Sequence, residues 1–152
     1  LPHEYFHQIQ SDIRPAPTSM PKWFVEGGAV FFSSLAYASW NPKFNYETYM
    51  LNNFSGNIYK QVLDTPCRKA TIEEMNDPDT PNPKGACAYS KGAMLVEYFV
   101  SKFGVEKYLE IWRTKVDPDW RSFEKVFLEV TGVNADVFYS GAIEFLKSRN
   151  WS

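Results

Sequence analysis

Histidine and cysteine are scarce in this chain, which has two of each among its 152 residues. Basic residues are not in excess either, because the formal net charge is −2 and the isoelectric point is near 5.7. The alternation of apolar and polar side chains that strands require is weak throughout. The composition therefore argues against a nucleic-acid partner and favours a mainly α-helical protein.

A long hydrophobic run is also missing. The most apolar segment, residues 23–40, is eighteen residues long and contains Glu26, two glycines and three serines. That length is at the short end for a bilayer span, and a charged side chain inside a span is costly. We therefore interpret residues 23–40 as a buried core helix and predict no membrane span.

The length and the apolar content suit one domain with a real core. The chain is 44% apolar and 17% aromatic, and we predict a single domain over residues 1–152. A capping box at Thr71–Glu74 predicts a short helix, and one or two short helices are expected within 43–63. Tyr5 and Ile143 are expected on the buried sides of their helices. The longer helices are expected at 2–12, 21–39, 86–103, 105–114, 120–130 and 135–149.

Both histidines lie in one pentapeptide near the start of the chain, HEYFH. Read as a helix, it places His3 and His7 on the same face, one turn apart, where both imidazoles can reach one metal ion. Glu4 then projects beside the ion, where a base can take a proton from metal-bound water. This is the HExxH pattern of zinc metallopeptidases. The alternative is a surface helix that carries two solvated histidines.

A third ligand must be a carboxylate, because no third histidine exists. Eighteen residues separate His7 from Glu26, and three prolines among them indicate a loop that lets a second helix fold back beside the first. Ser19 or Thr18 is expected as the N-cap of that helix, with Pro21 in its first turn. A lone carboxylate in so apolar a segment is costly to bury unless it is paired or binds a metal. The alternative is a Glu26 that points toward water.

These motifs resemble the gluzincins, the thermolysin-like and aminopeptidase-N-like zinc peptidases with an HExxH-x18-E arrangement. WFVEG resembles their W-x-x-E-G segment, YSKGA at 89–93 resembles their Y-x-K-G-A, and the tail 123–148 is similar to their closing helices. The resemblance implies one zinc ion per chain held by His3, His7 and Glu26, with Glu4 as the general base. It implies that the hydroxyl of Tyr89 donates to the oxyanion of the intermediate, the alternative being a packing tyrosine.

The resemblance thus predicts a zincin-type helical catalytic domain that hydrolyses peptide bonds of a peptide or protein substrate. The glutamate of a G-x-M-E-N strand is missing, and residues 31–35 read FFSSL without the acidic residue that often follows W-x-x-E-G. We therefore predict a metallopeptidase without specifying an aminopeptidase. Lys91 is interpreted as a structural or solvated charge.

The beginning of the chain leads to a further expectation. Leu1 and Pro2 leave His3 in the first turn, so we expect that the chain is a fragment, either of a cleaved precursor or of a larger protein. In gluzincins the upstream part holds a β-sheet whose edge strand binds the substrate backbone. That missing part of the same precursor is the second expected partner, besides the substrate.

Cys67 and Cys87 flank a turn-rich stretch that lacks an apolar core of its own. We predict a disulfide between them, which would stabilise the fold by roughly 3 kcal/mol in the loop-entropy description. A disulfide would indicate a secreted protein in an extracellular or periplasmic compartment. The alternative is two free thiols, and neither cysteine has the spacing of a zinc ligand.

The alternative function is a non-catalytic gluzincin-like domain that serves as a binding or structural part of a larger assembly. The early start of the chain favours this alternative slightly. The complete set of three ligands and one base favours the enzyme.

Overall fold

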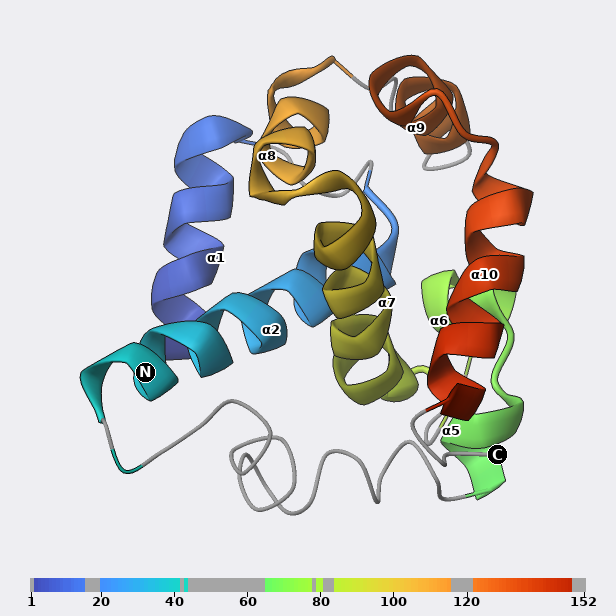
Figure 1. The fold of residues 1–152 in the computed structure, drawn as a ribbon, viewed down its shortest axis with the longest axis horizontal. Helices are drawn as coiled ribbons and strands as arrows, with labels where there is room; N and C mark the ends of the chain where they lie inside the picture. The colour runs from blue at the N-terminus through green and yellow to red at the C-terminus, as the bar shows by residue number, and fades with distance from the viewer. Residues whose placement is uncertain are drawn as a thin grey trace.

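The computed structural model describes residues 2–15, 20–41, 43, 65–77, 79–80, 84–115 and 122–148. Over these ranges all regular elements are helices, and no strand occurs, so the mainly α-helical class is confirmed (Figure 1). The short helices expected within 43–63 lie, apart from Lys43, outside the described residues. The helices in chain order are α1 (Pro2–Ile13), α2 (Lys22–Trp40), α5 (Thr65–Lys69), α6 (Ile72–Asn76), α7 (Cys87–Phe103), α8 (Val105–Arg113), α9 (Phe123–Thr131) and α10 (Ala135–Ser148).

Helix α2 is the central element, and it packs most extensively against α7 and next against α1 (Figure 1). Its first turns are held by aromatic side chains. Trp23 and Phe24 are fully buried, the ring of Phe24 stacks on Tyr108 with centroids 4.4 Å apart, and Trp23 stacks on Phe138 at 6.0 Å. Aromatic pairs of this kind add about 0.5–1.5 kcal/mol each beyond the area that they bury. The segment that carries Glu26 is therefore fixed against α8 and α10.

Several helix ends follow directly from local sequence. The hydroxyl of Thr71 accepts a hydrogen bond from the Glu74 amide at 3.1 Å, and the Thr71 amide donates to the Glu74 carboxylate at 2.9 Å, so the predicted capping box is present. Helices α7 and α9 end at Gly104 and Gly132, whose φ values of 83° and 73° lie in the region that glycine adopts without strain. None of the described helices is long and apolar enough to cross a bilayer.

The start of α2 differs from the expectation. The helix begins at Lys22, and Pro21 is its N-cap residue rather than part of the first turn; no side chain caps it. Thr18 and Ser19, the expected caps, lie outside the described residues. Proline lacks the amide hydrogen, so it fits an N-terminal boundary without leaving a donor unsatisfied.

Two side chains that we expected to be buried are exposed: Tyr5 is 70% exposed and Ile143 is 50% exposed. The buried residues of α1 are the polar His3 and Gln10, and Tyr5 lies off their face. There it lines an apolar hollow between α1 and α2 together with Phe32 and Trp40. Phe6 of the same helix is partly buried and stacks on Phe32 with ring centroids 4.9 Å apart, so apolar residues share the packed face of α1 with the polar cluster.

Candidate metal centre

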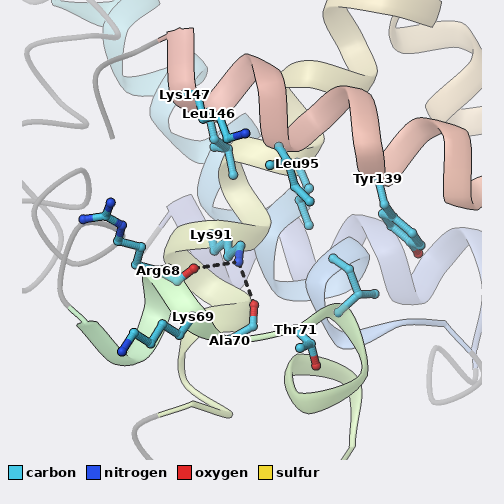
Figure 2. A pocket seen from close by; sticks show the side chains of 11 residues that line it. Arg68, Lys69, Ala70, Thr71, Lys91, Leu95, Tyr139, Leu146 and Lys147 are labelled. Carbon is cyan, nitrogen blue, oxygen red and sulfur yellow. Dashed lines mark hydrogen bonds between the residues drawn. The ribbon is translucent and has the colours of Figure 1, made fainter. Parts of the chain in front are cut away.

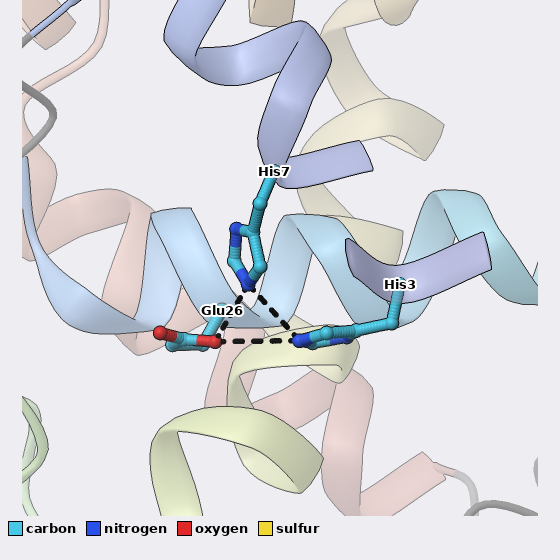
Figure 3. Close-up of side chains that lie close together, drawn as sticks. All are labelled: His3, His7 and Glu26. Carbon is cyan, nitrogen blue, oxygen red and sulfur yellow. Dashed lines mark hydrogen bonds and ion pairs between the residues drawn. The ribbon is translucent and has the colours of Figure 1, made fainter. Parts of the chain in front are cut away.

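The two imidazoles and the carboxylate come from helices that touch. His3 and His7 project from one face of α1, and Glu26 projects toward them from the second turn of α2 (Figure 3). His3 is buried, with 6% of its surface exposed, while the side chains of His7 and Glu26 are 26% and 19% exposed. Among the described residues, this is the one group of three or more His, Cys, Asp or Glu side chains whose ligand atoms could hold a metal ion.

The spacing of the three ligand atoms matches a tetrahedral zinc site. His7 Nε2 lies 3.0 Å from His3 Nε2 and 3.1 Å from Glu26 Oε2, and His3 Nε2 lies 3.6 Å from Glu26 Oε2. Zinc bonds of about 2.0–2.1 Å at tetrahedral angles place neighbouring ligand atoms about 3.3 Å apart. The centre of the circle through the three atoms is about 1.9 Å from each of them, so one zinc ion reaches all three. The donor set fits the ion.

The electrostatics of His3, His7 and Glu26 also favour a bound cation. Burial alone raises the pKa of the Glu26 carboxyl, but the neighbouring imidazoles of His3 and His7 outweigh burial, and the pKa is lowered from its ordinary value. The carboxyl is therefore ionised at neutral pH. Three electron-rich atoms that converge on one point need a positive charge between them, which a proton or a metal ion provides.

Glu4 is exposed and is not one of the three clustered ligands. Its negative charge acts on Tyr89 and contributes to the raised pKa of that phenol. Glu4 follows His3 on α1 and therefore lies near the cluster without belonging to it.

Tyr89 lies beside the ligand group, in the first turn of α7. Its ring stacks against the ring of His3, with centroids 6.0 Å apart and planes 24° from parallel. Burial raises the pKa of Tyr89, and the negative charges of the neighbouring Glu26 and Glu4 raise it further. The hydroxyl therefore keeps its proton at neutral pH and remains a hydrogen-bond donor.

Gln10 is a site residue that the motif analysis missed. It is 2% exposed, and its Oε1 lies 2.7 Å from Nδ1 of His7, while its Nε2 donates to the carbonyl of Val25 at 2.9 Å. The available signal is its position: Gln10 follows His7 by three residues and so shares its face of the helix. Sequence spacing alone does not distinguish such a partner from an ordinary surface glutamine.

Lys91 points away from this cluster and has a structural role. Its ammonium group donates to the carbonyls of Arg68, in the last turn of α5, at 3.5 Å and of Ala70, just after that helix, at 2.6 Å (Figure 2). Burial lowers its pKa. The same region contains a hollow of about 440 Å³, which has mainly apolar walls, including Leu95 and Leu146. None of the three clustered ligands lines this hollow.

Cys67 of α5 and Cys87, the first residue of α7, are joined by a disulfide. The bridge lies two residues before Tyr89, and it ties the short helix α5 to the end of α7 that borders the cluster. The three clustered side chains come from α1 and α2, which the bridge does not join.

Comparison with known proteins leaves the family open. No protein-family model, curated protein or solved structure matches this chain. The motifs and the geometry of the cluster are therefore the features from which a function can be inferred.

Proposed function

We propose that the protein is a gluzincin-type zinc metallopeptidase, which hydrolyses peptide bonds in a peptide or protein substrate. His3, His7 and Glu26 hold one zinc ion, and Glu4 and Tyr89 act on the substrate. One observation carries the proposal: three ligand atoms from two helices lie 3.0 to 3.6 Å from one another, at the separations of a tetrahedral zinc site.

A bound zinc ion would act as a Lewis acid that lowers the pKa of water to about 7 and polarises the scissile carbonyl. Glu4 then takes the proton of the attacking water and returns it to the leaving amine. The hydroxyl of Tyr89 donates to the oxygen that becomes negative as the carbonyl is attacked. Glu26 and the imidazoles do not exchange protons with substrate; they hold the ion beside these two groups.

The decisive experiment separates metal binding from catalysis in one substitution. Metal analysis of the purified native chain should give one zinc per molecule, and a quenched peptide library should be cleaved. Glu4→Gln should retain zinc and lose cleavage, because the amide keeps the shape of the side chain but cannot accept the proton. Glu106→Gln, at an exposed position in the first turn of α8, is the matched control and should cleave normally.

Zinc without cleavage in the native chain would contradict the proposal and indicate a non-catalytic metal-binding domain. Cleavage that survives Glu4→Gln would exclude Glu4 as the base.

A further inference from the structure

Gln10 is buried where α1, α2 and α8 meet, and its amide is hydrogen-bonded within α1 and to α2. Toward α1 its Oε1 meets Nδ1 of His7, and toward α2 its Nε2 donates to the carbonyl of Val25. Toward α8 it lies close to the hydroxyl of Tyr108, which is fully buried and donates to the carbonyl of Phe24 at 3.0 Å. Both ends of the amide are therefore held, the oxygen by His7 and the nitrogen by Val25.

The direction of each hydrogen bond follows from what the partners can do. A backbone carbonyl only accepts, so the NH₂ group of Gln10 must face Val25. The remaining Oε1 only accepts, so Nδ1 of His7 must carry a proton. With the proton on Nδ1, the lone pair of the neutral ring lies on Nε2, the atom that faces His3 and Glu26.

The absence of a side chain at Gly28 keeps room for this arrangement. A Cβ atom at Gly28 would overlap the hydroxyl of Tyr108, lie 3.0 Å from its Cζ, and lie 3.4 Å from Nε2 of Gln10. The second glycine of the WFVEGG segment thus lets Tyr108 and Gln10 meet the backbone of α2 immediately before Glu26. The same hydrogen bonds that orient His7 also fix α1 relative to the helix that carries the carboxylate.

We propose that Gln10 is a positioning residue, which holds His7 as the Nδ1–H tautomer and aims Nε2 at the metal position. The metal part of this inference rests on the proposed function, whereas the tautomer is a property of the chain itself. Outer hydrogen-bond partners of ligand histidines typically contribute 10- to 100-fold to metal affinity. Gln10 should contribute on that scale, although it touches neither the ion nor the substrate.

The tautomer can be measured directly, because the chain contains two histidines and the imidazole nitrogen spectrum has two rings to assign. In ¹⁵N-labelled native protein, we expect a proton on Nδ1 of His7 both without metal and after zinc is added. Zinc should change the shift of Nε2 only. Observation of an unprotonated Nδ1, with the proton on Nε2, would overturn the inference without any variant.

Two variants measure the contribution to affinity. Gln10→Met removes the amide and keeps an unbranched side chain, and we expect its zinc affinity to fall about 10- to 100-fold. Gln8→Met is the matched control on the same helix: Gln8 is exposed and donates to Asp12 at 2.9 Å, away from the cluster. Equal affinities for the two variants would contradict the inference.

The outcomes also separate this inference from the proposed function. A native chain that has the expected tautomer and does not bind zinc would refute the peptidase and leave the role of Gln10 in orienting His7 intact. A native chain that binds zinc and cleaves peptides, with Nδ1 unprotonated, would refute the role of Gln10 alone.

Discussion

Gly27 of α2 and Gly92 of α7 lie backbone to backbone at the crossing of the two central helices. A Cβ atom at Gly27 would lie 2.5 Å from the carbonyl oxygen of Gly92 and 2.7 Å from the next amide nitrogen, so no side chain fits there. Glu26 precedes the first glycine, and Tyr89 lies one turn before the second. Gly27 of WFVEG and Gly92 of YSKGA therefore permit the close helix crossing that places Glu26 beside Tyr89.

Gly27→Ala should consequently be one of the most damaging single substitutions outside the ligand set. The added methyl meets backbone atoms, which cannot move aside without separating α2 from α7, and overpacking of this kind costs about 1–3 kcal/mol or more. We expect the free energy of unfolding, measured with denaturant, to fall by about 3 kcal/mol and the zinc affinity to fall with it. Gly141→Ala is the matched control, because its methyl meets only the end of the Tyr98 side chain. Similar losses from both substitutions would argue against a rigid crossing.

Zinc should stabilise the folded chain, because the three ligands are assembled only when α1 and α2 pack together. At a free zinc concentration 100 times the dissociation constant, the gain is about 2.7 kcal/mol, and a chelator should reverse it. Thermal unfolding with and without zinc measures this effect. Mg²⁺ should have little effect, since it prefers oxygen ligands to imidazole. Glu26→Gln should lose most of this stabilisation by zinc. If zinc stabilised that variant as much as the native chain, Glu26 would not be a ligand.

Tyr89→Phe should separate turnover from metal binding. The ring still stacks on His3, but the donor to the oxyanion is lost, so turnover should fall on the order of 100- to 1000-fold. Zinc affinity should remain close to native, because the hydroxyl is not a ligand. Tyr37→Phe, at an exposed position of α2, is the control for a general effect of losing a phenol. If Tyr89→Phe kept the native turnover number, Tyr89 would have a packing role only.

The raised pKa of Tyr89 predicts how the metal-free protein responds to alkaline pH. Burial raises that pKa above the ordinary value of 10.0, and the charge of Glu26 raises it further. A folded-state pKa above the unfolded value stabilises the fold below pH 10, and that contribution is lost as the pH rises through the folded value. Glu26→Gln removes the charge, so the pKa of Tyr89 should move down toward 10, although burial keeps it raised. The absorbance of tyrosinate, taken as the difference between each protein and its Tyr89→Phe counterpart, measures this pKa. A higher pKa of Tyr89 in Glu26→Gln than in the native chain would contradict the influence of Glu26.

Removal of the disulfide should destabilise the chain without separating His3, His7 and Glu26. The cysteines are 20 residues apart, and for a loop of this size the loop-entropy description gives about 3 kcal/mol. Denaturant unfolding of the double variant Cys67→Ala/Cys87→Ala should show a loss of that order. Zinc affinity of the folded variant should change little, because the ligands lie on α1 and α2. A loss of zinc binding with intact folding would show that the bridge acts on the site.

Local sequence was sufficient to predict several features of the fold. The end of α7 at Gly104 and the capping box at Thr71 were predictable because each depends on contacts within a few residues. The outward direction of Tyr5 was not predictable in this way. Its exposure depends on which face of α1 packs on α2, and the polar contacts of Gln10 and the histidines decided that face.

By itself, the order of amino acids determined that His3 and His7 share one side of a helix, since a turn of 3.6 residues places positions four apart together. It also singled out Glu26 and Tyr89 through their motifs. Only the packed fold decided that these groups meet, because the distance between α1, α2 and α7 is set by glycines and aromatic rings that are far from one another along the chain. Gln10 became recognisable as a partner of His7 only when the carbonyl of Val25 determined the orientation of its amide.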